Sequence, residues 1–171
     1  MPLMGSTIET REDLFLHELG STLTMERTIL DMLEELQEKA MHDKLKAELG
    51  HHHDETERHV QNIESAFRAL DAEVDDSPCP AIEGLEKEGE SNLKKVDDSL
   101  NDAVILGGVA ETEHHEIAVY EGLITQARAM GKDEVVRLLE QNLRDEQAML
   151  AKGKQMHEQV ARGMAPVPAA S

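Results

Sequence analysis

The sequence predicts an all-α protein, an up-down four-helix bundle with an extra short crossover helix. Apolar residues recur at i, i+3 and i+4 spacing through four long segments, which is the pattern of amphipathic helices. No segment of useful length alternates between apolar and polar residues as a β-strand would. Aromatic residues make up only 2% of the chain, so we expect a core of aliphatic side chains and methionine.

The first two predicted helices form one antiparallel pair. The first runs from about Arg11 to Met41, with Thr10 as its N-cap and acidic residues in its first turn. Gly20 interrupts this helix at a cost of about 1 kcal/mol relative to alanine. The second runs from about Asp43 to Leu70, and the centre of its apolar stripe is polar while both ends are apolar.

A linker and a short helix are expected between the two pairs of long helices. Residues 72–80 contain two prolines and predict a turn and linker. Residues 81–95 predict a shorter helix, which would cross from the end of the second helix to the start of the third. We therefore expect the chain to traverse the length of the bundle at this point.

The third and fourth predicted helices form the second pair. The third runs from about Ser99, a candidate N-cap, to Met130, and Gly131 suits the position just after a helix. The fourth begins near Asp133. The expected domain covers residues 11–163, and we expect residues 1–10 and the small, proline-containing segment 164–171 to be disordered.

The composition argues against several classes of protein. The 17 Lys and Arg residues against 36 Asp and Glu residues give a formal charge of −19, so a nucleic-acid partner is not expected. There is no run of about 18 apolar residues, so a membrane span is not expected. The first residues lack the apolar segment of a signal peptide. The single cysteine, Cys79, excludes an internal disulfide and favours a cytoplasmic location, with the thiol as a small buried side chain.

Each of the four long helices carries a glutamate near the middle of its apolar stripe. These residues are Glu26, Glu55, Glu113 and Glu146. A carboxylate that faces a core is costly unless something neutralises it, and four at similar height favour a shared pair of metal ions. Inward carboxylates in a bundle core are how di-iron and di-manganese carboxylate proteins are built.

Seven side chains are candidate ligands for two metal ions with bridging carboxylates. Carboxylate oxygen and imidazole nitrogen suit iron and manganese, and ligands on one helix must lie three or four residues apart to face the same ion. Two histidines flank the glutamate of the second helix at suitable spacing, and a second glutamate follows the first on the third helix. The candidates are Glu26, His52, Glu55, His59, Glu113, Glu116 and Glu146.

Each candidate also has a structural interpretation. The second helix carries four histidines, at least two of which must face solvent. Glu26 could pair with Arg27, and part of the run ETEHHE is a solvated face, with His114 and His115 expected at the surface. Tyr120 is either a core tyrosine, the slightly favoured interpretation, or a hydrogen-bond donor to a ligand carboxylate.

Four segments resemble one known family, and they occur in its order. The run AETEHHEIAVYEGLITQARAMG is similar to the third-helix signature of the YciF/YciE-type, stress-associated ferritin-like proteins, whose members read close to EHYEIA-Y-TL-A-A-G. The segments HHHDETERHVQNIESAF, CPAIEGL and LLEQNLRDEQA resemble the second helix, the crossover and the fourth helix of that family. The resemblance implies a ferritin-like bundle that is a homodimer and binds two metal ions.

The ligand pattern of rubrerythrin-like relatives carries over to this chain only in part. Those relatives use a Glu, an E-x-x-H, an E-x-x-E and a second E-x-x-H, and the five candidate glutamates match. The histidines do not match, because Arg58 stands three residues after Glu55 and Met149 three residues after Glu146, followed by Leu150. The fourth helix therefore lacks an evident second ligand, which leaves an asymmetric or single-metal site open.

Three functional hypotheses follow. The leading one is a dinuclear iron or manganese protein with stress-related redox chemistry on oxygen or peroxide, as in a ferroxidase or peroxidase. The second is a non-enzymatic, stress-induced binding or scaffold protein with a structural, partial or vestigial metal site. The third is that no metal binds and that protonation or cations such as Arg58 neutralise the glutamates.

Overall fold

The described part of the chain folds into four long helices and one shorter helix. The structure, a computed structural model, describes residues 7–166, and it contains no strand within that range. The all-α prediction is confirmed. The helices are α1 (Arg11–Lys39), α2 (Asp43–Ala69), α3 (Pro80–Leu93), α4 (Asn101–Ala129) and α5 (Asp133–Ala161), with a 3₁₀ turn, η1 (Asp98–Leu100), before α4.

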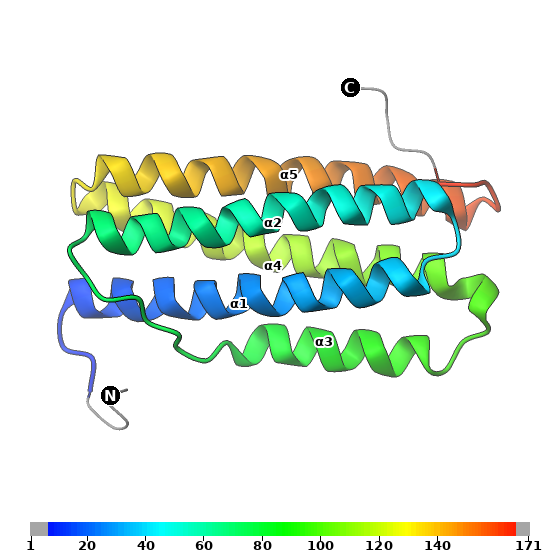
Figure 1. Cartoon of the computed structure of the whole chain (residues 1–171), viewed down its shortest axis with the longest axis horizontal. Helices are drawn as coiled ribbons and strands as arrows, with labels where there is room; N and C mark the ends of the chain where they lie inside the picture. Colours follow the sequence, from blue (N-terminus) through cyan, green and yellow to red (C-terminus); the bar gives the residue numbers. More distant parts are fainter. Residues whose placement is uncertain (1–6, 167–171) are drawn as a thin grey trace.

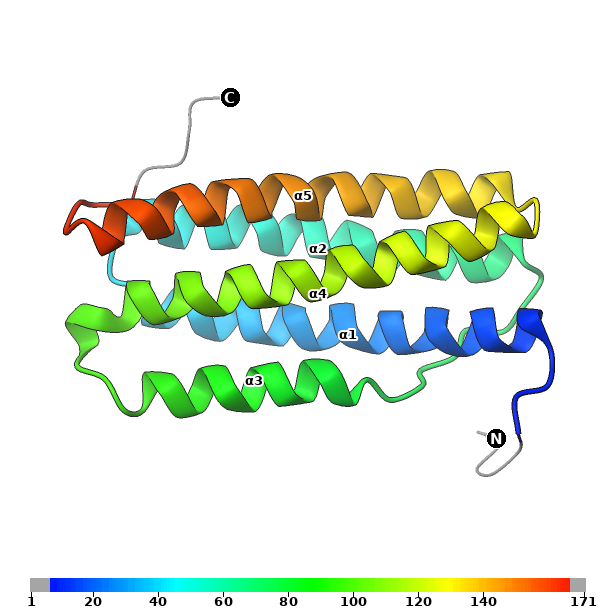
Figure 2. The same ribbon diagram turned by 180° about the vertical axis from the view of Figure 1, so that it is seen from behind.

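The long helices form a ferritin-like bundle in which neighbouring helices run in opposite directions (Figure 1). α1 packs against α2 and α4, and α5 packs against α4 and α2. The segment after α2 returns along the bundle, and α3 lies beside α1 and α4 (Figures 1 and 2). One long crossover of this kind is typical of ferritin-like bundles. The predicted short crossover helix is therefore present.

Most of the predicted helix ends agree with the structure. Thr10 caps α1, since its hydroxyl oxygen accepts a hydrogen bond of 3.0 Å from the Asp13 amide. Gly131 follows α4 with a positive φ of 68°, a conformation that favours glycine. The expected N-cap Ser99 is wrong: it lies inside η1, where its amide donates to Asp97 at 3.0 Å, and α4 begins at Asn101.

Hydrogen bonds connect the turn between α1 and α2 to the start of α4. α1 ends at Lys39, two residues earlier than predicted, because Ala40 turns out of the helical conformation. The buried carboxylate of Asp102 then accepts hydrogen bonds from the amides of Met41, at 2.6 Å, and His42, at 3.2 Å. Asn101 donates to the Lys39 carbonyl at 3.1 Å.

The linker before α3 crosses α1 at Gly20. A Cβ atom on this glycine would lie 3.1 Å from atoms of Asp75, so a side chain there would push the linker away. Beside it, the Ser21 hydroxyl donates to the carbonyl of Pro78 at 3.0 Å. The helix-weakening glycine noted in the sequence thus permits the close approach of the crossover.

The buried side chains form two apolar ends and a polar middle. The end that contains the N-terminus of α1 is filled by residues such as Phe15, Leu19 and Phe67, and the opposite end by residues such as Leu45 and Leu106. Between them lie buried glutamates and histidines. Within residues 7–166, no helix combines the length and the apolar character needed to cross a membrane.

The expected disordered ends lie partly outside the described residues. Of the N-terminal ten, residues 1–6 are outside the description, and residues 7–9 precede the cap of α1 without helical structure. Of the C-terminal eight, residues 167–171 are outside it. The Met164 amide donates to the Gln159 carbonyl at 2.9 Å, and Pro166 is buried.

Candidate metal centre

Six of the seven predicted ligands come together at the middle of the bundle. They project inward from all four long helices and are at most 2% exposed. α1 and α5 supply one residue each, whereas α2 and α4 supply two each. The six residues are Glu26 of α1, His52 and His59 of α2, Glu113 and Glu116 of α4, and Glu146 of α5.

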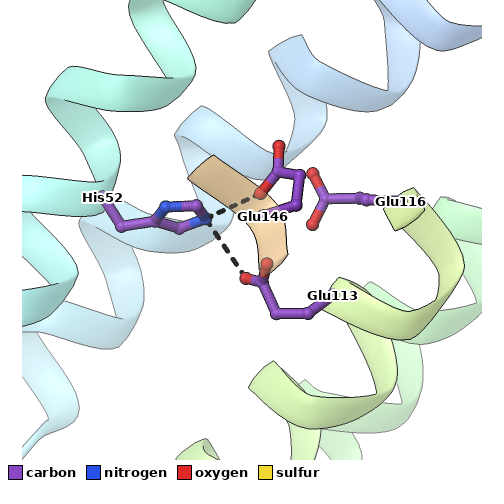
Figure 3. Close-up of side chains that lie close together, drawn as sticks. All are labelled: His52, Glu113, Glu116 and Glu146. Carbon is purple, nitrogen blue, oxygen red and sulfur yellow. Dashed lines mark ion pairs between the residues drawn. The ribbon is translucent and has the colours of Figure 1, made fainter. Parts of the chain in front are cut away.

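The first cluster contains one histidine and three glutamates. His52, Glu113, Glu116 and Glu146 each offer a ligand atom, and these atoms all lie within 4.8 Å of one another. The side chains converge from three helices (Figure 3). Nε2 of His52 is 3.1 Å from Oε1 of Glu113 and 3.5 Å from Oε2 of Glu146. Four donors around one point are enough for a metal position.

The second cluster contains Glu26, His59 and Glu146, whose ligand atoms also lie within 4.8 Å of one another. Nδ1 of His59 is 2.8 Å from Oε1 of Glu146 and 3.6 Å from Oε2 of Glu26. Glu146 is common to both clusters. Since its Oε2 faces His52 and its Oε1 faces His59, it is placed as a carboxylate that could bridge two ions.

Carboxylates outside the clusters contact the ring nitrogens of His52 and His59 that face away from the clusters. Oε2 of Glu55 is 3.2 Å from Nδ1 of His52, and Oδ2 of Asp145 is 3.2 Å from Nε2 of His59. Metal-ligating histidines are commonly oriented in this way, with the second ring nitrogen bonded to a carboxylate. The inner nitrogens of both rings are thereby turned toward the clusters.

Glu55 is therefore not among the residues that the structure gathers into the clusters. Its side chain is 13% exposed and also contacts His51, at 3.1 Å. The sequence placed it with the ligands because it lies one turn after His52 on the same face of α2. At that spacing the Glu55 carboxylate reaches Nδ1 of His52, the ring nitrogen that faces away from the cluster. Nε2 of His52 faces the cluster and occupies the position that we expected an oxygen of Glu55 to take.

Arg58 lies at the rim of the centre. Its guanidinium is 3.6 Å from Asp145 and 3.9 Å from Glu55. The only ion pairs of Glu26, Glu113 and Glu146 within the described part of the chain are to His52 and His59. Arg58 thus offsets the negative charge of Asp145 and Glu55. The carboxylates of the clusters pair with the two histidines instead.

Tyr120 belongs to the centre, contrary to the slightly favoured interpretation of it as a plain core residue. Its hydroxyl donates a hydrogen bond to Oε1 of Glu26. The amide of Asn142 donates to the Tyr120 oxygen at 3.0 Å and to the His59 carbonyl at 3.3 Å, and Asn62 donates to Asn142 at 2.7 Å. Asn142 lies four residues before Glu146, so its place on the apolar stripe of α5 was a signal that sequence analysis could have used.

Eight buried polar atoms of the clusters form no hydrogen bond, although several lie in the histidine–carboxylate ion pairs given above. A buried polar atom without a partner is costly and requires an explanation. All eight belong to the six converging residues that make up the two clusters, as expected of metal-ligand atoms. They are Oε2 of Glu26, Nε2 of His52, Nδ1 of His59, Oε2 of Glu113, and both carboxylate oxygens of Glu116 and of Glu146.

The electrostatics of the centre oppose the charged carboxylates and favour the charged histidines. Burial raises the pKa of Glu26, Glu116 and Glu146, and the neighbouring glutamates raise that of Glu116 further. Burial also acts to lower the pKa of His52 and His59. Nearby carboxylates outweigh it, Glu113 foremost for His52 and Glu26 for His59, and raise these pKa values to about 10 and about 12. Without a cation, both rings hold a proton at neutral pH.

The remaining histidines of α2 and α4 lie outside the clusters. His51 and His114 are exposed, and His53 is half-buried. The surface prediction for His115 is wrong, because it is half-buried with Nε2 enclosed. Cys79 is buried, as predicted. Burial acts to raise the pKa of its thiol, but hydrogen bonds with His115, the Ile82 backbone and Ser21 outweigh burial and lower it.

Comparison with known proteins shows relatives that match this chain over most of their length. The protein YciF of Escherichia coli (strain K12) is 27% identical over 143 residues, which cover 82% of this chain and 86% of YciF. The crystal structure of this E. coli stress protein superimposes with a TM-score of 0.86, covering 91% of this chain and 99% of YciF. YcfI of Rhodopseudomonas palustris is 34% identical, with a TM-score of 0.85 and coverage of 88% of this chain and 96% of YcfI.

The family model described as "Domain of unknown function (DUF892)" matches residues 10–165. That range includes all five helices and every residue of the buried clusters. Together with the likeness to YciF in sequence and fold, this match shows that the chain belongs to the DUF892 family.

Proposed function

We propose that this chain is a dinuclear metal protein that binds iron or manganese at the middle of its bundle and uses the pair in redox chemistry on oxygen or peroxide. The observation that carries the proposal is the sharing of Glu146 by two buried clusters whose ligand atoms lack other partners. Oxygen and imidazole donors without a thiolate suit these metals. The likeness to the E. coli stress protein YciF favours a role in stress.

The two proposed positions differ in their ligands. His52, Glu113, Glu116 and Glu146 would hold the first ion, and Glu26, His59 and Glu146 the second. α5 supplies only Glu146, since Met149 one turn later is an apolar core residue. The second position would therefore have fewer protein ligands than the first.

A pair of such ions would supply the electrons for reducing oxygen or peroxide. The chain's own residues contribute a buried set of ionisable side chains between two apolar ends, where electrostatic interactions are stronger than in water. Glu55 and Asp145 hold the histidine rings in orientation. The hydroxyl of Tyr120 donates a hydrogen bond to the Glu26 carboxylate and so orients it at the second position.

The experiment that tests the proposal is a metal analysis by mass spectrometry. The chain is produced without a tag in medium supplemented with iron and manganese, and about two ions per chain are expected. Glu113→Ala should lose metal while the bundle stays folded, whereas Glu121→Ala, at an exposed position of the same helix, should load fully. A fully loaded Glu113→Ala protein would contradict the proposal.

A non-enzymatic role is the second candidate. It is favoured by the single ligand from α5 and by YcfI of R. palustris, which is described as a candidate structural protein. In this case the metal stabilises a stress-induced binding or scaffold protein. Loaded protein that turns over neither oxygen nor hydrogen peroxide, and whose melting temperature falls when a chelator removes the metal, would favour this role over redox chemistry. The homodimer and the cytoplasmic location remain predictions.

A further inference from the structure

An apolar cavity lies between α3 and the α1–α4 pair. Its volume is about 420 Å³, within the range of about 300–1,000 Å³ that is common for small-molecule sites. α3 and the residues just after it form one wall of the cavity, and residues of α1 and α4, with His52 of α2, form the rest. Both views of the ribbon show α3 set beside these two helices at the side of the bundle (Figures 1 and 2).

The cavity reaches the proposed metal centre. His52 and Glu113, which belong to the first cluster, line it at one end. Aliphatic residues such as Leu33, Leu85 and Ile105 line most of the remainder. A molecule in this space would therefore lie against mostly aliphatic walls and near His52 and Glu113 of the first cluster.

The apolar character and the negative charge of the lining side chains indicate which class of ligand the cavity would bind. Aliphatic cavities take up apolar molecules, and one of about 150 Å³ lined by Leu, Ile and Phe binds benzene. An anion is disfavoured, because Glu113 lies at the inner end, Glu88 and Glu111 lie at exposed positions of the lining, and the chain carries a formal charge of −19. Among the described residues that line the cavity, Lys95 is the only lysine or arginine. A neutral, apolar molecule fits best.

We propose that this cavity binds a neutral, apolar organic molecule and holds it beside the His52–Glu113 side of the metal centre. Binding in the cavity needs only the protein, whereas the position of the ligand next to a metal rests on the proposed function. The proposal names a class of molecule that dinuclear redox chemistry in this chain could act on, in addition to oxygen or peroxide.

Two glycines in the lining provide a way to close the cavity. A Cβ atom on Gly108 of α4, or on Gly89 of α3, would meet no atom within 4 Å. Gly108→Leu therefore adds a side chain into open space, and leucine favours the helix over glycine. Gly122 is the matched control, since it lies in the same helix, is exposed, likewise has no atom within 4 Å and does not line the cavity.

The test uses N-phenyl-1-naphthylamine, a neutral apolar dye whose emission rises and shifts to the blue in apolar surroundings. Metal-free full chain should bind one dye molecule saturably. Gly108→Leu should bind about tenfold more weakly or not at all, and Gly122→Leu within about twofold of the parent chain. Gly89→Leu repeats the test from α3, and circular dichroism melts identify a variant that fails to fold.

The proposal is overturned if the dye does not saturate, or if folded Gly108→Leu and Gly89→Leu both bind as tightly as Gly122→Leu. It is also overturned if binding disappears at protein concentrations where the chain dimerises, which would assign the cavity to a second copy.

Cobalt(II), a paramagnetic substitute for iron(II), separates this proposal from the metal proposal. If both hold, loading with cobalt should quench the emission of bound dye. Glu26→Gln, which alters the second metal position and does not line the cavity, should lose about one of the two ions and keep dye binding in the metal-free protein. Dye binding without any metal loading would leave the cavity proposal standing and reject the proposed function. Metal loading without dye binding would reject the cavity proposal and leave the proposed function standing.

Discussion

The hydroxyl of Tyr120 donates a hydrogen bond to the Glu26 carboxylate across the middle of the bundle. This contact joins α4 to α1 beside the second cluster. Both side chains are fully buried, so neither atom has water as an alternative partner. The pair thus links the packing of the bundle to the proposed metal ligands.

Tyr120→Phe tests this link. Removing the hydroxyl leaves an oxygen of Glu26 without its donor, and buried groups left without a partner cost about 1–3 kcal/mol. We expect the free energy of unfolding of the metal-free protein to fall by that amount in urea denaturation. Thr125→Val removes an exposed hydroxyl from the same helix and should change the free energy by less than about 0.5 kcal/mol. Equal effects of the two substitutions would contradict a special role for Tyr120.

Glu146→Gln and Glu26→Gln should differ in how much metal they remove. Glu146 contributes to both clusters, whereas Glu26 contributes only to the second. We therefore expect Glu26→Gln to retain about one ion per chain and Glu146→Gln clearly less, because loss of a shared carboxylate weakens both positions. Mass spectrometry of the loaded proteins provides the count. If both variants retain the same amount of metal, Glu146 does not bridge.

Glu55→Gln separates a ligand from a residue that orients a ligand. Glu55 contacts the outer nitrogen of His52 and lies outside the clusters. Loss of such an orienting carboxylate commonly weakens metal affinity about 10–100-fold. We expect weaker binding in a competition titration with a chelator, but an unchanged number of ions at saturation. A reduced number at saturation would instead identify Glu55 as a ligand, as the sequence suggested.

Metal affinity should increase with pH. The pKa values of His52 and His59 are raised to about 10 and about 12, so both rings carry a proton at neutral pH and must lose it to bind a metal. The raised pKa values of Glu26, Glu116 and Glu146 act in the same direction. Because protons compete with the metal, binding should release protons and tighten between about pH 6 and pH 8.

Isothermal titration calorimetry in buffers of different ionisation enthalpy measures this release directly. The observed heat of metal binding should change with the buffer in proportion to the number of protons released. A heat that is the same in every buffer would show that the histidines do not lose protons on binding.

The sequence predicted the bundle and most of the centre because both depend on periodicity. An apolar stripe at i, i+3 and i+4 spacing places Glu26, Glu113 and Glu146 on inward faces wherever the helices pack. The choice of His52 and His59 from four histidines also follows, since they lie seven residues apart on one face of α2. These expectations need no knowledge of how the helices are placed relative to one another.

Contacts between helices were less predictable. The spacing of Glu55 from His52 fits a ligand and an orienting carboxylate equally well, and only the position of the other helices separates the two roles. Asp145 holds His59 from off the apolar stripe of α5, so no pattern indicated it. The orientation of Tyr120 toward Glu26 depends on how α1 and α4 face each other. The cavity depends on the distance at which α3 lies from the bundle, which composition does not determine.

The polar middle gives the bundle two separate hydrophobic cores in place of one continuous core. In the metal-free state, the region between them is the weaker part of the bundle, because it holds buried ionisable groups around Glu116 whereas the apolar contacts lie at the two ends. Backbone amides beside Glu116 and Glu146 should then exchange with solvent through local openings that leave both ends folded. A cation shared by helices of both pairs would join the two cores into one cooperative unit, so that the metal content of the cell would determine whether this chain unfolds as one body or as two.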